Sequence, residues 1–433
     1  MKSITRLTAR TILFGNLIVL AACDQFKDQR QDQPKVQAKA EVNSEQLLSA
    51  MNLYVYTQLS DALNKAQTLD SEITSLLHHP NPVSLEQSQN AWQQAYEGYV
   101  KVSFLHRVPR FEKPQYYENN RTYDDIRQRI DSWPIEPGYI DYLPQYPLSG
   151  IVNDLTLKIS LDNLVDQHGF SDPRYASIGF HPLEFLLFAE NSERSAKDFI
   201  PQENSMEVVA TEPEIQAETQ AINSDAEHVD SDIKDIRHAQ PVINGPQNHN
   251  RRRDYLRILS ADLVKQLQAL TDRWDPANGY YAKQWRQPDH AANVASLYQG
   301  LVDALQTDLL EQHFQVLATQ KPLYDLRSPF AQQDTANMQA LLTGIENILL
   351  AENGFIKEIR LQDAELADKI KAQFERLKYD MKQLPNNWET LEQVQRHQVL
   401  IEPKDKTLQL LTLMYQGAES LGIRLKALPV STD

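Results

Sequence analysis

The sequence predicts an all-α protein of two packed helical bundles related by an internal repeat, with an irregular connector rich in proline and aromatic residues. Three observations carry this prediction. Apolar residues recur at steps of three and four over long stretches, which is the helical period. Alternating runs of β-branched residues hardly occur. Glycine is rare, at 13 of 433 residues, and turn residues fall between the long helical patterns.

The N-terminus has the pattern of a secretory signal peptide over residues 1–22. Basic residues precede an apolar stretch, 11–22, that is too short to span a bilayer. It ends Leu-Ala-Ala-Cys at Cys23, which resembles the lipobox of bacterial lipoproteins and implies a diacylglyceryl group on that thiol. The alternative is an ordinary signal peptide with an incidental cysteine. We expect a periplasm-facing lipoprotein of the cell envelope, held by lipid in the inner or outer membrane.

A polar tether and then the first bundle follow the lipidation site. Residues 23–43 are rich in Gln, Asp and Lys, which is typical of a flexible linker. The predicted N-terminal bundle covers 44–194, and its first helix covers 43–79, ending before Pro80. Ser84, with Gln87 three residues later, is expected to open the next helix. The aromatic residues of that helix favour a core role over a cofactor site.

Residues 133–150 contain several prolines and aromatic residues, which predicts an ordered, irregular connector because proline blocks helix. Its aromatic side chains are expected to close the end of the bundle. An alternative interpretation is that Glu136 or Asp141 supplies a ligand to a site near His181.

The composition changes between residues 195 and 250, which are acidic and poor in aromatic residues. Such a segment cannot bury enough apolar surface to offset its loss of conformational entropy, so we predict a disordered insertion. Its histidines are expected to be solvated rather than metal-bound. The predicted C-terminal bundle covers 251–433 and begins with a helix over 255–274.

An internal repeat links the two halves. Residues 184–191 and 346–353 both read E-x-[L/I]-L-x-A-E-N. The second copy keeps the carboxylate as Glu346 but has Thr343 where the first has His181. The repeat therefore indicates a structural helix, and it marks His181 as the residue specific to the first copy.

His181 and Glu184 are the candidate site. Residues three apart lie on one helix face, so an imidazole and a carboxylate could hold a metal ion such as iron or zinc. The alternative is a helix start in which His181 is the cap and Glu184 closes a capping box. A metal site needs a third protein ligand, for which Asp141, Glu136 and Glu346 are candidates. No H-E-x-x-H or G-x-S-x-G motif occurs, so catalytic residues remain unassigned.

Three segments resemble the imelysin family, and the similarity runs from about 43 to 428. Residues 179–188, G-F-H-P-L-E-F-L-L-F, are similar to its G-x-H-x-x-E signature. Residues 133–142, W-P-I-E-P-G-Y-I-D-Y, resemble its W-P-L-D-E-G-x-I-D-Y stretch, and 326–330, L-R-S-P-F, resemble its S-x-x-S segment. Tyr96 and Ser103 stand where family members usually carry Arg and Glu, and Pro137 replaces an acid. The resemblance implies an all-helical, two-bundle envelope protein linked to iron uptake, with peptidase activity in some members only.

The net charge of −16 argues against nucleic-acid binding and against peripheral attachment to anionic lipid.

The motifs and the family resemblance together lead to three hypotheses about function. The first is a lipid-anchored periplasmic protein that binds iron, or an iron-uptake partner, through His181 and Glu184. The others are a metal-dependent peptidase and a non-catalytic interaction scaffold.

Overall fold

The computed structural model describes residues 43–108, 121–202, 248–285 and 290–426. Within these ranges the chain is helical and forms no strand, with only an isolated bridge between Leu143 and Tyr146. The all-α prediction is confirmed. Cys23, the predicted signal peptide and most of the predicted tether lie outside the described residues.

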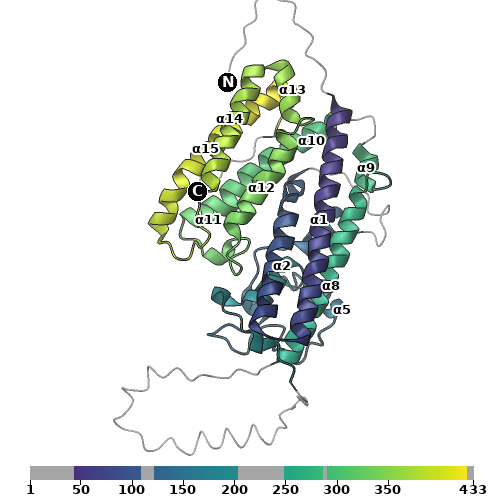
Figure 1. Ribbon diagram of the computed structural model, residues 1–433, viewed down its shortest axis with the longest axis vertical. Helices are drawn as coiled ribbons and strands as arrows, with labels where there is room; N and C mark the ends of the chain where they lie inside the picture. The colour runs from purple at the N-terminus through teal and green to yellow at the C-terminus, as the bar shows by residue number, and fades with distance from the viewer. Residues whose placement is uncertain (1–42, 109–120, 203–247, 286–289, 427–433) are drawn as a thin grey trace, which may run out of the picture. The chain divides into compact units, whose positions relative to one another are not determined.

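The first group of helices is built on three long rods that lie side by side in Figure 1. Helix α1 packs against both α2 and α8. The apolar residues of α1 at helical spacing form its buried face, as the sequence predicts. Helix α2 approaches α1 closely, because Gly98 lies against the backbone of Ala62. The bounds of the three rods are α1 Ser44–His78, α2 Pro82–Val100 and α8 His249–Trp274.

Shorter elements fill the spaces around these rods. They are the 3₁₀-helix η1 Ser103–Arg107, α3 Tyr123–Ile130, α4 Pro137–Ile140, α5 Leu161–Gln167, α6 Phe180–Phe188, the 3₁₀-helices η4 Glu190–Ser192 and η5 Ala196–Phe199, and α9 Tyr280–Trp285. Helix α6 contacts both α2 and α8, and all nine of its residues are buried. A continuous apolar run suits such a helix because it has no solvent face.

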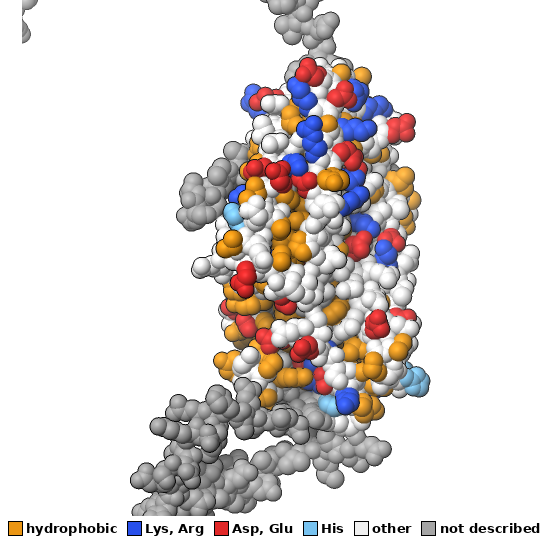
Figure 2. Space-filling model, turned by 60° about the vertical axis from the view of Figure 1, so that its left-hand side comes forward, with side chains coloured by type: hydrophobic (Ala, Val, Ile, Leu, Met, Phe, Trp, Pro, Cys, Tyr) orange, Lys and Arg blue, Asp and Glu red, His pale blue; other side chains and the backbone are white. Residues whose placement is uncertain are grey.

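The second group contains the later helices, which lie beside the first group in Figure 1. They are α10 His290–Asp303, the π-helical segment η7 Ala304–Phe314, α11 Gln315–Ala318, the 3₁₀-helix η8 Leu323–Asp325, α12 Asp334–Leu349, α13 Phe355–Gln362, α14 Ala364–Met381 and α15 Gln393–Ser420. Ion pairs such as Lys378–Glu346 and Arg360–Asp368 occur on this group. Acidic and basic side chains are interspersed over the face shown in Figure 2.

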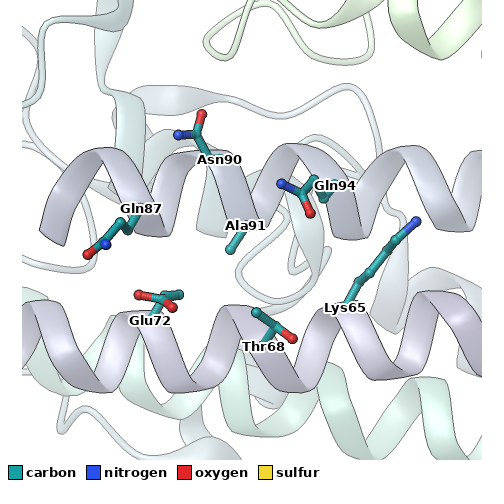
Figure 3. A pocket seen from close by; sticks show the side chains of 7 residues that line it. All are labelled: Lys65, Thr68, Glu72, Gln87, Asn90, Ala91 and Gln94. Atoms are coloured by element: carbon teal, nitrogen blue, oxygen red, sulfur yellow. The ribbon is translucent and has the colours of Figure 1, made fainter. Parts of the chain in front are cut away.

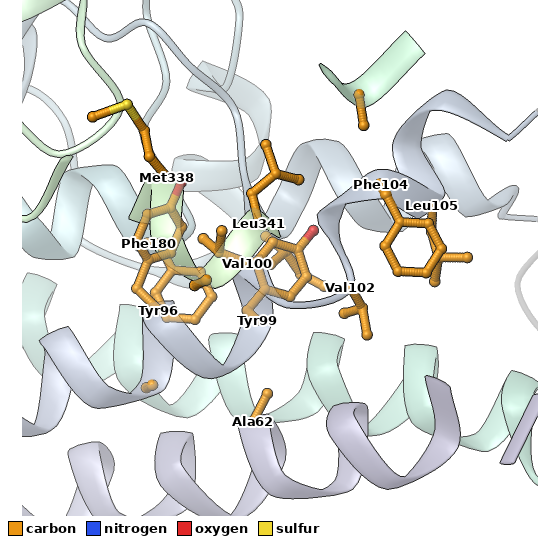
Figure 4. Close-up of a cluster of buried hydrophobic side chains, with 14 of the residues drawn as sticks. Ala62, Tyr96, Tyr99, Val100, Val102, Phe104, Leu105, Phe180, Met338 and Leu341 are labelled. Carbon is orange, nitrogen blue, oxygen red and sulfur yellow. The ribbon is translucent and has the colours of Figure 1, made fainter. Parts of the chain in front are cut away.

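The two groups meet where α2 ends. Helix α12 contacts α2 and η1 there, and Figure 4 shows Tyr96, Tyr99 and Phe180 in one buried cluster with Met338 and Leu341 of α12. A Cβ added to Gly344 would lie 2.0 Å from the Lys101 carbonyl oxygen, so only glycine permits this approach. The aromatic residues of α2 are therefore core residues, as predicted.

Two boundaries differ from the sequence-based expectation. Asn81 caps α2, and Ser84 completes the capping box with it rather than opening the helix itself. Within the predicted insertion at 195–250, Phe199 is fully buried in η5 and α8 begins at His249. Residues 203–247 lie outside the described residues, and the domain boundaries stay a prediction.

Candidate functional site

Helix α6 is positioned by the glycine of the G-F-H-P-L-E sequence. Gly179 has a φ of +99°, and a Cβ there would lie 2.6 Å from the Ile130 carbonyl oxygen. Glycine is favoured in this backbone region, and here it also permits the close approach. The start of α6 therefore packs against the end of α3. Asp131 is the residue that directly follows α3. His181 is 1% exposed and Glu184 is fully buried.

His181 lies between two carboxylates. Its Nε2 is 2.8 Å from Asp131 Oδ1, and its Nδ1 is 3.4 Å from Glu184 Oε2. The Tyr96 hydroxyl donates to Asp131 Oδ1 at 3.0 Å. Burial alone would lower the pKa of His181, but the hydrogen bonds and charges of Asp131 and Glu184 raise it above its usual value. Each ring nitrogen of His181 therefore has a carboxylate as its partner.

Asp131 is the centre of this buried network, and Arg327 is its counterion. Arg327 Nη1 donates to Asp131 Oδ2 at 3.0 Å. Burial alone would raise the pKa of Asp131, but Arg327 and His181 hold it well below its usual range. Arg327 Nη2 also lies 3.5 Å from Asp308 Oδ1, which Arg107 binds at 2.6 Å. The network therefore continues into the π-helical segment η7.

Glu184 holds the segment that precedes α12. Its Oε1 accepts backbone N–H groups from Phe330 at 3.0 Å and Ala331 at 2.9 Å. Burial raises the pKa of Glu184, while the His181 hydrogen bond and charge oppose that rise. Gly179, not His181, occupies the cap position of α6, and it makes no side-chain cap bond. The capping-box alternative for His181 and Glu184 is therefore not what the structure shows.

A second buried acid and imidazole lie next to this network. Asp334 Oδ1 accepts the Ser328 N–H at 3.2 Å and lies 3.8 Å from His313 Nδ1. Burial raises the pKa of Asp334 to about 7, and the charge of Glu184 adds to the rise. Burial lowers the pKa of His313 to about 3, and Arg327 lowers it further. His313 is therefore neutral near pH 7, where Asp334 titrates.

The other predicted ligands bind cations elsewhere. Asp141 is fully buried, and it accepts from Arg252 Nε at 2.6 Å and pairs with Arg194 at 3.1 Å. Glu136 lies 3.8 Å from Arg174, and Glu346 pairs with Lys378 at 2.7 Å. No contact in the described part of the chain joins any of these three carboxylates to His181 or Glu184.

The residues that depart from the family pattern lie at or near the network. Tyr96, which departs from the expected family pattern, contacts both Asp131 and His181 through its hydroxyl. Ser103 is buried at the start of η1. In this chain Arg327 supplies the positive charge beside Asp131.

The donor set of the network does not fit a metal ion in this arrangement. His181 has a carboxylate at each ring nitrogen, Asp131 is bound by Arg327, and Glu184 Oε1 is bound by two backbone N–H groups. Over the ranges that the structure describes, no group of three or more His, Cys, Asp or Glu residues could hold a metal ion.

A surface pocket between α1 and α2 lies outside this network. It has a volume of about 240 Å³ and is lined by polar side chains, among them Glu72, Gln87 and Gln94 (Figure 3). None of its lining residues belongs to the His181 network.

None of the described helices is both long and apolar enough to cross a membrane.

The helix order and the buried network define an all-α protein in which ion pairs join the two groups of helices. The model of the imelysin family, also designated peptidase family M75, matches residues 55–421, and the chain belongs to that family. The fold resembles a crystal structure from Parabacteroides distasonis, described as an iron-regulated protein A precursor. The TM-score is 0.55 at 11% identity, covering 89% of this chain and 97% of that chain. No curated protein matches this chain.

Proposed function

We propose that this protein is a lipid-anchored component of the bacterial cell envelope that serves iron uptake by binding a partner. In this proposal the His181 network is a structural junction rather than a metal centre. The observation that supports a structural role for this network is that both ring nitrogens of His181 are hydrogen-bonded to carboxylates. An imidazole that binds a metal must offer one nitrogen lone pair, whereas both ring nitrogens of His181 are already hydrogen-bonded to carboxylates.

The envelope and iron assignments rest on the sequence and on the relatives. The motif that ends at Cys23 supports lipidation, and Cys23 is the only cysteine in the chain. Several acyl chains, at roughly 0.8 kcal/mol for each buried CH₂, give stable anchoring where a single chain does not. The iron connection comes from the family resemblance and from the structural relative that is described as iron-regulated.

The alternative is a metal-dependent peptidase. Such an enzyme needs a metal with an open coordination position and a path for the peptide. His181 and Glu184 are buried and bonded to protein groups, so the described geometry does not favour hydrolysis at this site.

The metal question is tested by thermal unfolding of the wild type and of His181→Gln, each with and without Fe²⁺, Fe³⁺ or Zn²⁺. A metal ion raises the thermal midpoint only if it binds the folded state. We therefore expect each metal to shift the midpoint of the wild type no more than it shifts the midpoint of His181→Gln. Comparing each variant with itself removes the effect of the substitution on folding. A metal-induced rise that is present in the wild type and absent in His181→Gln would overturn the structural assignment.

The anchoring and iron roles are tested together in cells. A strain that lacks this protein should grow poorly when a chelator limits iron, and the wild-type chain should restore its growth. Cys23→Ser should leave an unprocessed or unlipidated form that takes up no lipid label and restores growth much less well. Normal growth of the deletion strain under chelation would contradict the iron role, and unchanged membrane extraction together with unchanged lipid labelling of Cys23→Ser would contradict lipid anchoring.

A further inference from the structure

A pocket of about 360 Å³ lies at α3, and two arginines line it. Arg121 stands just before the helix and Arg129 is in its last turn. The other residues used here are Gln128, which is exposed, and His168 after α5. None of the residues that line this pocket belongs to the His181 network.

Among the described residues, neither pocket arginine forms an ion pair by direct contact, although nearby carboxylates act on both at longer range. Arg121 Nη1 donates to the Gln266 amide oxygen at 2.8 Å, which is a neutral partner. Within the described part of the chain, the Arg129 side chain makes no hydrogen bond or ion pair. Burial lowers the pKa of Arg121, and the nearby charges of Arg129 and Arg273 lower it further. Positive charges that repel one another are stabilised when an anion binds between them.

The acids at the pocket offset only part of this charge. Asp125 also lines the pocket and interacts with both arginines, while its Oδ2 accepts the N–H and hydroxyl of Thr122 in the capping box of α3. The lining therefore holds two guanidinium groups against one carboxylate. Asp262 also acts on Arg121 from outside the lining, and its Oδ1 accepts the Gln266 amide. Burial lowers the pKa of His168 to about 4, so this imidazole is neutral at physiological pH.

We infer that this pocket binds a small oxyanion through Arg121 and Arg129. Guanidinium groups bind carboxylates and phosphates through paired hydrogen bonds, and the exposed Gln128 amide provides a further donor at the rim. The volume is sufficient for a small multivalent anion. Because the whole chain carries a net charge of −16, anions are not attracted to it in general, so binding requires this local cluster. This inference does not depend on the proposed iron role.

The test is isothermal titration of citrate and, separately, of inorganic phosphate into the full-length protein at low ionic strength. We expect saturable one-site binding of at least one of the two probes. Arg121→Gln and Arg129→Gln should each weaken it by about tenfold or more, because each removes a charge-assisted hydrogen bond. Binding of citrate alone identifies a carboxylate ligand, and binding of phosphate alone identifies a phosphate ligand.

Arg127→Gln is the matched control. Arg127 lies on the same helix, but it pairs with Asp124 and does not line the pocket. Its replacement should leave the affinity unchanged, and thermal unfolding should show that all three variants fold. The inference is overturned if neither probe binds the wild type, or if Arg127→Gln weakens binding as much as the pocket variants do.

Discussion

Replacing Arg327 with methionine is expected to destabilise the protein by about 3–5 kcal/mol at neutral pH, because it leaves the buried Asp131 carboxylate without its counterion. Arg327 donates to Asp131 at 3.0 Å, and both side chains are buried in the network. Methionine retains much of the apolar stem, so the loss measures the charge pairing rather than a large cavity. Denaturant unfolding of the purified variant measures the change.

A double-mutant cycle separates this pairing from other effects. Asp131→Asn removes the charge that Arg327 neutralises, so adding it to Arg327→Met should recover part of the lost stability. Arg360→Met is the surface control, because Arg360 pairs with Asp368 where both side chains are well exposed. Its stability should be almost unchanged. Equal losses from Arg327→Met and Arg360→Met, or no recovery in the double variant, would show that the Asp131 pair does not stabilise this junction.

Asp334→Asn is expected to stabilise the protein at pH 8 and to have little effect near pH 4. The pKa of Asp334 is about 7 in the folded state and 3.8 as a free side chain. The folded state therefore holds a proton that the unfolded state has lost, and stability from this group falls as pH rises from about 4 to about 7. Asparagine cannot ionise, so the variant should not lose this free energy of unfolding, which is on the order of a few kcal/mol. Its amide oxygen can still accept the Ser328 N–H.

The measurement is the midpoint of denaturant unfolding for wild type and Asp334→Asn across this pH range. Asp125→Asn provides a control of opposite sign, since the Thr122 N–H holds the pKa of Asp125 below its usual value. That variant should lose a little stability above about pH 4 and none well below it. If the stability difference between Asp334→Asn and wild type does not depend on pH, the Asp334 carboxyl does not titrate in this window.

The long helices were predictable because their information is local. The apolar spacing of α1 and α8 reports which face is buried, and the prolines at 80 and 82 mark the turn between α1 and α2. The pairing of His181 with Glu184 was predictable for the same reason, because three residues along a helix fix which side chains are neighbours.

The rest of the network was missed because its partners are distant in sequence. Asp131 lies 50 residues before His181, and Arg327 lies 196 residues after Asp131. No local pattern indicates that these residues meet, although Arg327 falls within a segment that resembles the family. Glu346 shows the converse limit, because it shares a sequence pattern with Glu184 but pairs with Lys378, and both side chains of that pair are 26% exposed.

The distance in sequence between Asp131 and Arg327 also constrains the order of events when the chain is made. Helix α1 needs α8, and Asn52 of α1 donates to the Trp274 carbonyl oxygen 222 residues later. Until the C-terminal half emerges, Asp131 has no guanidinium and α1 has no complete partner face. Contacts of such separation form slowly, because loop closure precedes any gain. The buried face of α1 and the Asp131 pair therefore cannot be completed until the later part of the chain is available.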